Sequence, residues 1–101
     1  MPQSQKQIPL RQIEDFCRRW KIQEFALFGS VLRKDFPPDS DIDVLVSFAP
    51  DGGITFDNRV EMLDELAEIF GRQVDLVEKD AIRNPFRRHD IITTKEVIYA
   101  A

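Results

Sequence analysis

Residues 28–46 read FGSVLRKDFPPDSDIDVLV, and this stretch decides how the rest of the chain is interpreted. It begins with a Gly-Ser step, passes through a proline pair, and ends in an apolar run headed by two alternating aspartates. The run over residues 41–48 has the period-2 pattern of a β-strand, with successive side chains on opposite faces. One face carries Ile42, Val44, Val46 and Phe48, and the other carries Asp41, Asp43, Leu45 and Ser47.

Asp41 and Asp43 therefore lie on the same face of this strand, one pleat apart. Two carboxylates so close together repel each other and gain little from packing. A divalent cation between them removes that penalty, and Mg²⁺ suits the position because it prefers carboxylate oxygens and leaves sites open for substrate phosphates. The pair predicts a magnesium site.

A third acid, Asp75, lies between Val74 and Leu76 in a second apolar run, where the pattern predicts a buried position in a strand over residues 73–78. If that strand lies beside residues 41–48, Asp75 faces the same cations. Three carboxylates then hold two Mg²⁺ ions, an arrangement that stabilises both the attacking and the leaving oxygen of a phosphoryl transfer.

The Gly29-Ser30 step supplies the second half of the predicted site. Gly29 allows a sharp turn and a close approach of the backbone to a ligand. Ser30 is expected to cap a short helix reaching Phe36, whose free N–H groups attract phosphate. Arg33 lies one turn further along and is a candidate phosphate ligand. Together with the acids, this turn indicates an enzyme that transfers a nucleotidyl group from a nucleoside triphosphate.

The other elements predict an α/β (α+β) fold, with a small mixed β-sheet and flanking helices. Helices are expected over residues 9–20, 56–70 and 84–93, and strands over 25–28, 41–48, 73–78 and 97–99, the last being either a short strand or an extended tail. The helices over 9–20 and 56–70 are expected to cover one face of the sheet. Core positions of the 56–70 helix are predicted on one side: Val60, Leu63, Leu66, Ala67 and Phe70.

The chain has 101 residues and a net charge of −4, which predicts one domain over 1–101, with residues 1–7 as a flexible tail. The negative charge argues against general nucleic-acid binding, so no direct nucleic-acid partner is expected. Cys17 is the single cysteine, which excludes an internal disulfide. No stretch approaches the ~20 apolar residues of a membrane span, so a cytoplasmic protein without a membrane partner is expected.

Several other side chains have simpler interpretations. Asp39 and Ser40 fit a turn, His89 fits the surface, and Cys17 and Trp20 fit the core. The acids of the 56–70 helix, which are Glu61, Asp64, Glu65 and Glu68, fit its solvent-exposed face. The basic set Arg83, Arg87, Arg88 and Lys95 fits a solvated face, or else a surface that helps to hold triphosphate or meets an acidic partner.

The spacing Gly29-Ser30, ten residues, then Asp41-Ile42-Asp43 resembles the signature of minimal nucleotidyltransferases of the polymerase-beta superfamily. The resemblance extends over roughly residues 9–99, with Asp75 at the place of the family's third acid and looser similarity toward Tyr99. Within that superfamily the chain is similar to MntA-type antitoxins, which are encoded beside a HEPN-domain toxin. The resemblance implies the polymerase-beta-like fold and Mg²⁺-dependent transfer of AMP from ATP onto a tyrosine of that toxin.

The resemblance also implies roles for individual residues. Asp41, Asp43 and Asp75 are the catalytic and metal-binding acids, and Gly29 and Ser30 bind the phosphates. Three possibilities stay open at this point. The chain is either such an enzyme, or an antitoxin that neutralises its toxin by binding alone, or a nucleotidyltransferase subunit acting on a small molecule such as an aminoglycoside.

Overall fold

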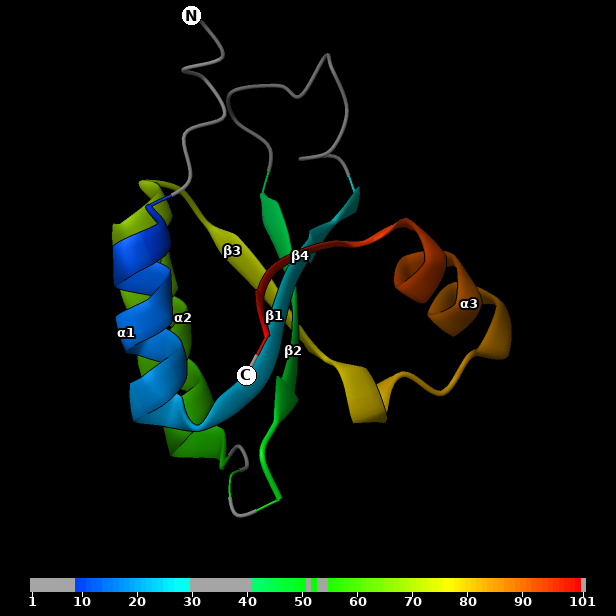
Figure 1. Cartoon of the computed structure of the whole chain (residues 1–101), viewed down its shortest axis with the longest axis horizontal. Coiled ribbons are helices and arrows are strands. Elements are labelled where there is room, and N and C mark those ends of the chain that lie inside the picture. Colours follow the sequence, from blue (N-terminus) through cyan, green and yellow to red (C-terminus); the bar gives the residue numbers. More distant parts are fainter. Residues whose placement is uncertain (1–8, 30–40, 51, 53–54, 101) are drawn as a thin grey trace, which may run out of the picture.

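The computed structural model of the chain describes residues 9–29, 41–50, 52 and 55–100. Figure 1 shows a four-stranded sheet with two helices on one side and one helix on the other. In chain order the elements are α1 (Leu10–Trp20), β1 (Ile22–Phe28), β2 (Ile42–Phe48), α2 (Phe56–Phe70), β3 (Val74–Glu78), the 3-10 turn η3 (Lys79–Ala81), α3 (Pro85–Thr94) and β4 (Glu96–Ala100). The mixed α/β architecture predicted from the sequence is confirmed.

Local signals set the ends of α2, which coincide with the prediction. The Thr55 hydroxyl accepts a hydrogen bond from the Asn58 backbone N–H, with 3.1 Å between the two heavy atoms, and caps the first turn. Gly71 closes the last turn in the left-handed conformation, at φ +73°, and its N–H donates to the Ala67 carbonyl. Both ends of the helix are therefore encoded by neighbouring residues.

The sheet has the strand order β3-β2-β1-β4 and is mixed. β1 pairs antiparallel with β2 on one side and with β4 on the other. β2 and β3 are parallel, so the chain must cross over between them, and α2 makes that crossover. The predicted strand over 97–99 is confirmed as β4, and the predicted neighbourhood of the strands carrying Asp43 and Asp75 is confirmed as the β2–β3 pair.

α1 and α2 cover one face of the sheet, as predicted (Figure 1). The main core lies between these helices and the sheet. Its fully buried members include Phe16 and Cys17 from α1, Phe25 from β1 and Leu66 from α2. Burial, and secondarily the nearby Glu14 carboxylate, raise the pKa of the Cys17 thiol to about 12, so the cysteine behaves as an apolar core residue.

The opposite face carries a smaller apolar cluster under α3. Its buried members are Ala26, Phe28, Leu45, Ile82 and Ile91, with Val77 packed against them. Leu45 belongs to this cluster whereas Val44 and Val46 belong to the main core, which confirms the predicted alternation along β2. Residues of β2 with the same parity as Leu45, Asp43 among them, therefore face α3 rather than the paired helices.

One predicted core position of α2 is wrong. The Val60 side chain is 48% exposed, whereas Met62, which was not predicted, is fully buried together with Leu66. The apolar stripe of α2 is rotated because its orientation is set by contact with α1 and the sheet, and not by hydrophobicity alone. The predicted short helix from Ser30 to Phe36 lies outside the described residues. None of the helices in the described part of the chain is long and apolar enough to cross a membrane.

Candidate functional site

Two acids lie side by side at the start of the parallel pair formed by β2 and β3. Asp43 of β2 and Asp75 of β3 are partners in the strand register. Neighbouring strands are roughly 4.8 Å apart, and residues in parallel register point to the same face of the sheet. The carboxylates of Asp43 and Asp75 thus share the face that also carries α3. The predicted convergence of these two strands is what brings them together.

Asp75 differs from the prediction in its burial. The sequence pattern predicts a buried acid between two apolar neighbours, but Asp75 is exposed, while Leu76 is buried in the main core. The difference arises because β3 is an edge strand and alternates between the two faces of the sheet. Val74 and Leu76 point to the helices α1 and α2, whereas Asp75 and Val77 point to the opposite face.

Gly29 closes one side of the acid pair. It follows β1 directly, has φ +78°, and stands next to Phe28, the register partner of Asp43. A methyl group placed on Gly29 would meet the Asp43 carboxylate, with the carboxyl carbon only 3.3 Å away. The position therefore requires glycine twice, once for the left-handed backbone and once for the space beside Asp43.

The electrostatics around Asp43 show which charges gather there. Partial burial raises the pKa of Asp43, and the nearby carboxylates of Asp75 and Asp41 raise it further. The guanidinium of Arg87, from the first turn of α3, acts in the opposite direction. The site thus combines Asp43 and Asp75 of the sheet, Asp41 directly before β2, and one arginine of α3. Burial and like-charge repulsion together outweigh the single positive charge.

This repulsion is relevant to a metal ion. Neighbouring ionised carboxylates repel each other, and a divalent cation bound between them removes this repulsion. In residues 9–29, 41–50, 52 and 55–100, however, no group of three acidic, histidine or cysteine side chains converges closely enough to hold a metal. The carboxylate oxygens are thus of the type that binds Mg²⁺. They lie near one another but do not converge into a complete set of metal ligands. Ser30 and Arg33 lie outside the described residues.

Arg87 was predicted only as part of a basic surface and not as a site residue. The Asn84 side chain accepts hydrogen bonds from the backbone N–H groups of Phe86 and Arg87, so α3 begins at Pro85. Ile91, four residues after Arg87, is buried against the sheet. The i to i+4 spacing from a buried isoleucine is the signal that would have placed Arg87 on the sheet-facing side of the helix.

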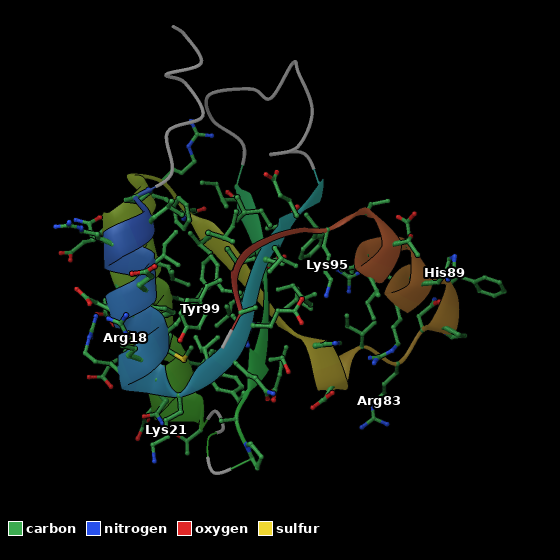
Figure 2. The ribbon with its side chains drawn as sticks, viewed as in Figure 1. Arg18, Lys21, Arg83, His89, Lys95 and Tyr99 are labelled. Atoms are coloured by element: carbon green, nitrogen blue, oxygen red, sulfur yellow. The ribbon has the colours of Figure 1, made fainter. Side chains whose placement is uncertain are left out.

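Other basic residues hold α3 in place. The Lys95 ammonium pairs with the Glu24 carboxylate of β1, and Lys79 lies 3.8 Å from the same carboxylate. Arg88 donates a hydrogen bond to the Lys79 carbonyl, with a donor–acceptor distance of 2.7 Å. Figure 2 shows Lys95 on the sheet side of α3 and His89 on its outer side. His89 is exposed, as predicted.

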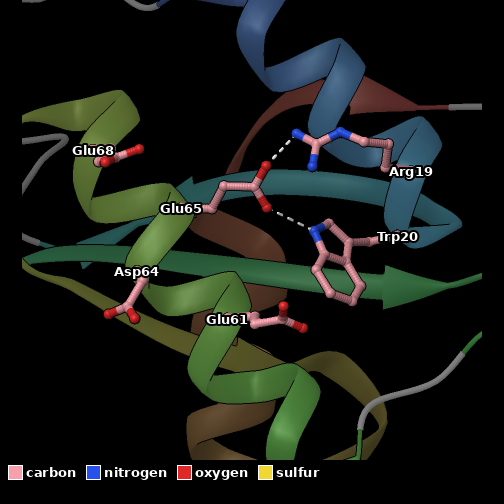
Figure 3. Close-up of a pocket in the computed structure, with 6 residues that line it drawn as sticks. All are labelled: Arg19, Trp20, Glu61, Asp64, Glu65 and Glu68. Atoms are coloured by element: carbon pink, nitrogen blue, oxygen red, sulfur yellow. Dashed lines mark hydrogen bonds and ion pairs between the residues drawn. The ribbon is translucent and has the colours of Figure 1, made fainter.

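A hollow of about 350 Å³ lies on the other side of the molecule, between α1 and α2 (Figure 3). Its lining residues are Arg19, Trp20, Glu61, Asp64, Glu65 and Glu68. Glu65 accepts a hydrogen bond from the Trp20 indole, at 2.9 Å, and pairs with Arg19. The remaining acids make this hollow unsuitable for a triphosphate because it would add negative charge to negative charge. Glu65 is thus a paired residue, in contrast to the predicted fully solvated acid.

Comparisons with known proteins show the family to which the chain belongs. Residues 10–99 match the family model of the nucleotidyltransferase domain. A predicted protein adenylyltransferase of Methanocaldococcus jannaschii is 35% identical over 81 residues, which cover 80% of this chain and 79% of that protein. The protein adenylyltransferase MntA of Thermococcus cleftensis is 30% identical over 86 residues, covering 85% of this chain and 82% of that protein.

Solved structures show the same fold. A chain of a toxin–antitoxin complex crystallised with AMP-PNP superimposes with a TM-score of 0.75 at 24% identity, covering 93% of this chain and 75% of that chain. A chain of the tri-AMPylated Shewanella oneidensis HEPN toxin in complex with its MNT antitoxin gives a TM-score of 0.66 at 22% identity, covering 99% and 74%. The chain belongs to the nucleotidyltransferase domain family, and within it to the minimal nucleotidyltransferases named protein adenylyltransferases.

Proposed function

We propose that this protein transfers AMP from ATP onto a tyrosine of a partner HEPN-domain toxin and thereby acts as its antitoxin. The observation that carries the proposal is the register pairing of Asp43 with Asp75, next to Gly29 at the end of β1. The relatives named protein adenylyltransferases support the reaction, and the fold shared with toxin–antitoxin complexes supports the type of partner. A single domain and a cytoplasmic location belong to the same proposal.

In this reaction the phenolic oxygen of the acceptor tyrosine forms a bond to the α-phosphorus of ATP. The bond from that phosphorus to the bridging oxygen breaks, and pyrophosphate leaves with the bonding electrons. The phenolic proton passes to a carboxylate, for which we assign Asp75. Its exposed position makes it accessible to a partner's side chain. The products are an AMP-tyrosine phosphodiester and pyrophosphate.

Asp41, Asp43 and Asp75 would hold two Mg²⁺ ions, because the repulsion that raises the pKa of Asp43 is relieved by bound cations. When bound, such ions neutralise charge on the reacting phosphate and the leaving oxygen. The protein's own contribution is to keep the acids on a rigid parallel strand pair. Gly29 lets the backbone lie close to the Asp43 carboxylate. Gly29 and Ser30 are assigned to the β- and γ-phosphates, with Arg33 as a further phosphate ligand.

The direct test is incubation of the purified protein with Mg²⁺, ATP labelled at the α-phosphate and the HEPN-domain protein encoded beside it. We expect label on a tyrosine of that partner, and none when Asp43→Ala replaces the wild type. Asp64→Ala, on the exposed side of α2 at the other face of the sheet, is the matched control and should retain activity. Full activity of Asp43→Ala would contradict the assignment of the site.

A second measurement distinguishes neutralisation by binding alone from neutralisation by AMP transfer. The double variant Asp41→Asn/Asp43→Asn is expressed with the partner toxin at the level of the wild type. We expect growth arrest by the toxin because the modification is absent. If the double variant protects cells as well as the wild type, occlusion rather than catalysis neutralises the toxin. Label on an added small molecule without any protein partner would instead indicate a small-molecule acceptor.

A further inference from the structure

Arg87 occupies a defined place relative to the acid site. It lies in the first turn of α3, and its backbone N–H is fixed by the Asn84 side chain at 3.2 Å. Ile91, one turn later on the same side of the helix, is buried in the cluster that contains Phe28 and Leu45. Phe28 is the register partner of Asp43, and Leu45 follows Asp43 on the same face of β2. Arg87 thus lies on the side of α3 that carries the buried Ile91, on the sheet face that also carries the acid pair.

The Arg87 side chain is exposed, yet it lies close enough to Asp43 to act on that carboxylate. Its neighbours in sequence have other contacts. Arg88 donates to the Lys79 carbonyl, and Lys95 pairs with Glu24 at the far end of α3. These contacts tie the start of the helix to η3 and its end to β1. The Arg87 side chain remains exposed to solvent, and its charge acts on Asp43.

We propose that Arg87 is a nucleotide-binding residue that holds the phosphates which are not transferred, so that α3 forms one wall of the triphosphate site. The proposal rests on the proposed nucleotidyltransferase function and adds a residue from outside the sheet and the Gly29-Ser30 turn. An arginine suits the role because its planar guanidinium donates two parallel hydrogen bonds to phosphate oxygens and stays charged at every working pH.

Charge explains why the site has use for such a residue. The three acids compensate bound cations, but a triphosphate brings further negative charge toward the same carboxylates. Arg87 is the basic side chain within the described part of the chain that acts on Asp43. A guanidinium beside the acids reduces the repulsion on the triphosphate tail, whereas AMP, which lacks the two outer phosphates, gains nothing from it.

The experiment measures equilibrium binding by calorimetry, with Mg²⁺ and without the partner protein, for ATP and for AMP. We expect Arg87→Ala to weaken ATP binding by about ten- to a hundredfold, the range for a lost hydrogen bond to a charged group, and to leave AMP binding within about twofold. Arg87→Lys should keep part of the ATP affinity, because it retains the charge and loses the paired donors.

Arg83→Ala is the matched control. Arg83 precedes α3, is exposed, and extends away from the sheet in Figure 2. Its removal changes the net charge equally and should leave both affinities unchanged. The melting temperature of each variant shows whether it folds, and Arg87→Lys provides a second measurement if Arg87→Ala unfolds.

Each outcome decides the proposal. Equal losses for ATP and AMP, or unchanged ATP affinity in Arg87→Ala, would overturn it and leave Arg87 a partner of Asp43 only. A wild-type protein that binds no ATP would overturn it as well. If Arg87→Ala selectively loses ATP but the wild type labels no protein, the assignment of Arg87 stands and the proposed protein acceptor fails. The two proposals are thereby tested separately.

Discussion

The two faces of the sheet differ in what they bury and in what they expose. The face under α1 and α2 holds fully buried apolar side chains such as Phe16, Val44 and Leu66. The face under α3 has a smaller apolar cluster, and beside it lie Asp43, Asp75 and Gly29. The difference teaches that the face under α1 and α2, with its larger apolar core, supplies more of the folding free energy. The face under α3 brings like charges together, which lowers stability.

β2 takes part in both tasks. Val44 and Val46 are packed into the main core, and Asp43, between Ile42 and Val44, points to the open face. The packed valines and the pairing of β2 on both sides hold the backbone rigid, which fixes the position of Asp43. The core is thus the support that keeps the acids close despite their repulsion.

The largest expected effect separates activity from stability. Asp43→Asn should abolish nucleotidyl transfer, yet raise the melting temperature at neutral pH in the presence of a metal chelator. Because the folded state raises the pKa of Asp43, its ionised form costs stability above that pKa, and the amide removes this cost. Thermal unfolding with and without Mg²⁺ checks this. A lower melting temperature in the chelator would show that Asp43 is a structural residue.

On the face covered by α1 and α2, substitution is expected to lower stability rather than raise it. Phe16→Ala should lower the free energy of unfolding by about 3–5 kcal/mol, since the side chain is fully buried and contacts Phe25 edge-on. Val60→Ala, at a position of α2 that is 48% exposed, is the control and should change it by less than about 0.5 kcal/mol. Urea denaturation measures both. Comparable losses in the two variants would mean that Val60 is part of the core.

Two glycines allow backbone strain to be separated from the space beside the acids. Gly29 and Gly71 have similar positive φ values of +78° and +73°, but an added methyl group meets Asp43 at Gly29 and nothing within 4 Å at Gly71. Gly71→Ala should cost about 1 kcal/mol. Gly29→Ala should cost at least about 1 kcal/mol more and reduce nucleotide binding, as measured by denaturation and calorimetry. Equal costs would show that Asp43 moves aside freely.

The smallest expected effect is at the acid-lined hollow. Burial opposes ionisation of Glu65, but the hydrogen bonds from Arg19 and Trp20 outweigh it and lower the pKa of Glu65. The ionised form therefore contributes stability above the unfolded pKa, and this contribution disappears as the pH falls through the folded pKa. Glu65→Gln should cost about 0.5–1 kcal/mol at pH 7 and nothing at strongly acid pH. A pH-independent cost would contradict the role of the charge.

The sequence predicts best those features that neighbouring residues encode. The bounds of α2 follow from Thr55 and Gly71, and the two faces of β2 follow from its alternation. The start of β1 was predicted only from Phe25, because Gln23 and Glu24 are polar. They are in a strand through pairing with β2 and β4, which are distant in sequence.

For the candidate site, too, the sequence predicts the features that local patterns encode. Asp41, Asp43 and Gly29 stand out by spacing, and Asp75 by its apolar neighbours. The exposure of Asp75 was not predictable because the pattern of a strand does not state which face is covered. Arg87 was not singled out among four basic residues, since its orientation depends on how Ile91 packs into the apolar cluster under α3. Both gaps concern tertiary packing rather than local preference.

The position of β4 has a consequence for how the protein is synthesised. β1 lies inside the sheet only because β4 pairs with it, and β4 is the last of the four strands to leave the ribosome. Until then β1 presents an unpaired edge, and Glu24 lacks the Lys95 partner that holds the end of α3. We therefore expect nascent chains to be inactive and prone to association until translation has passed residue 100.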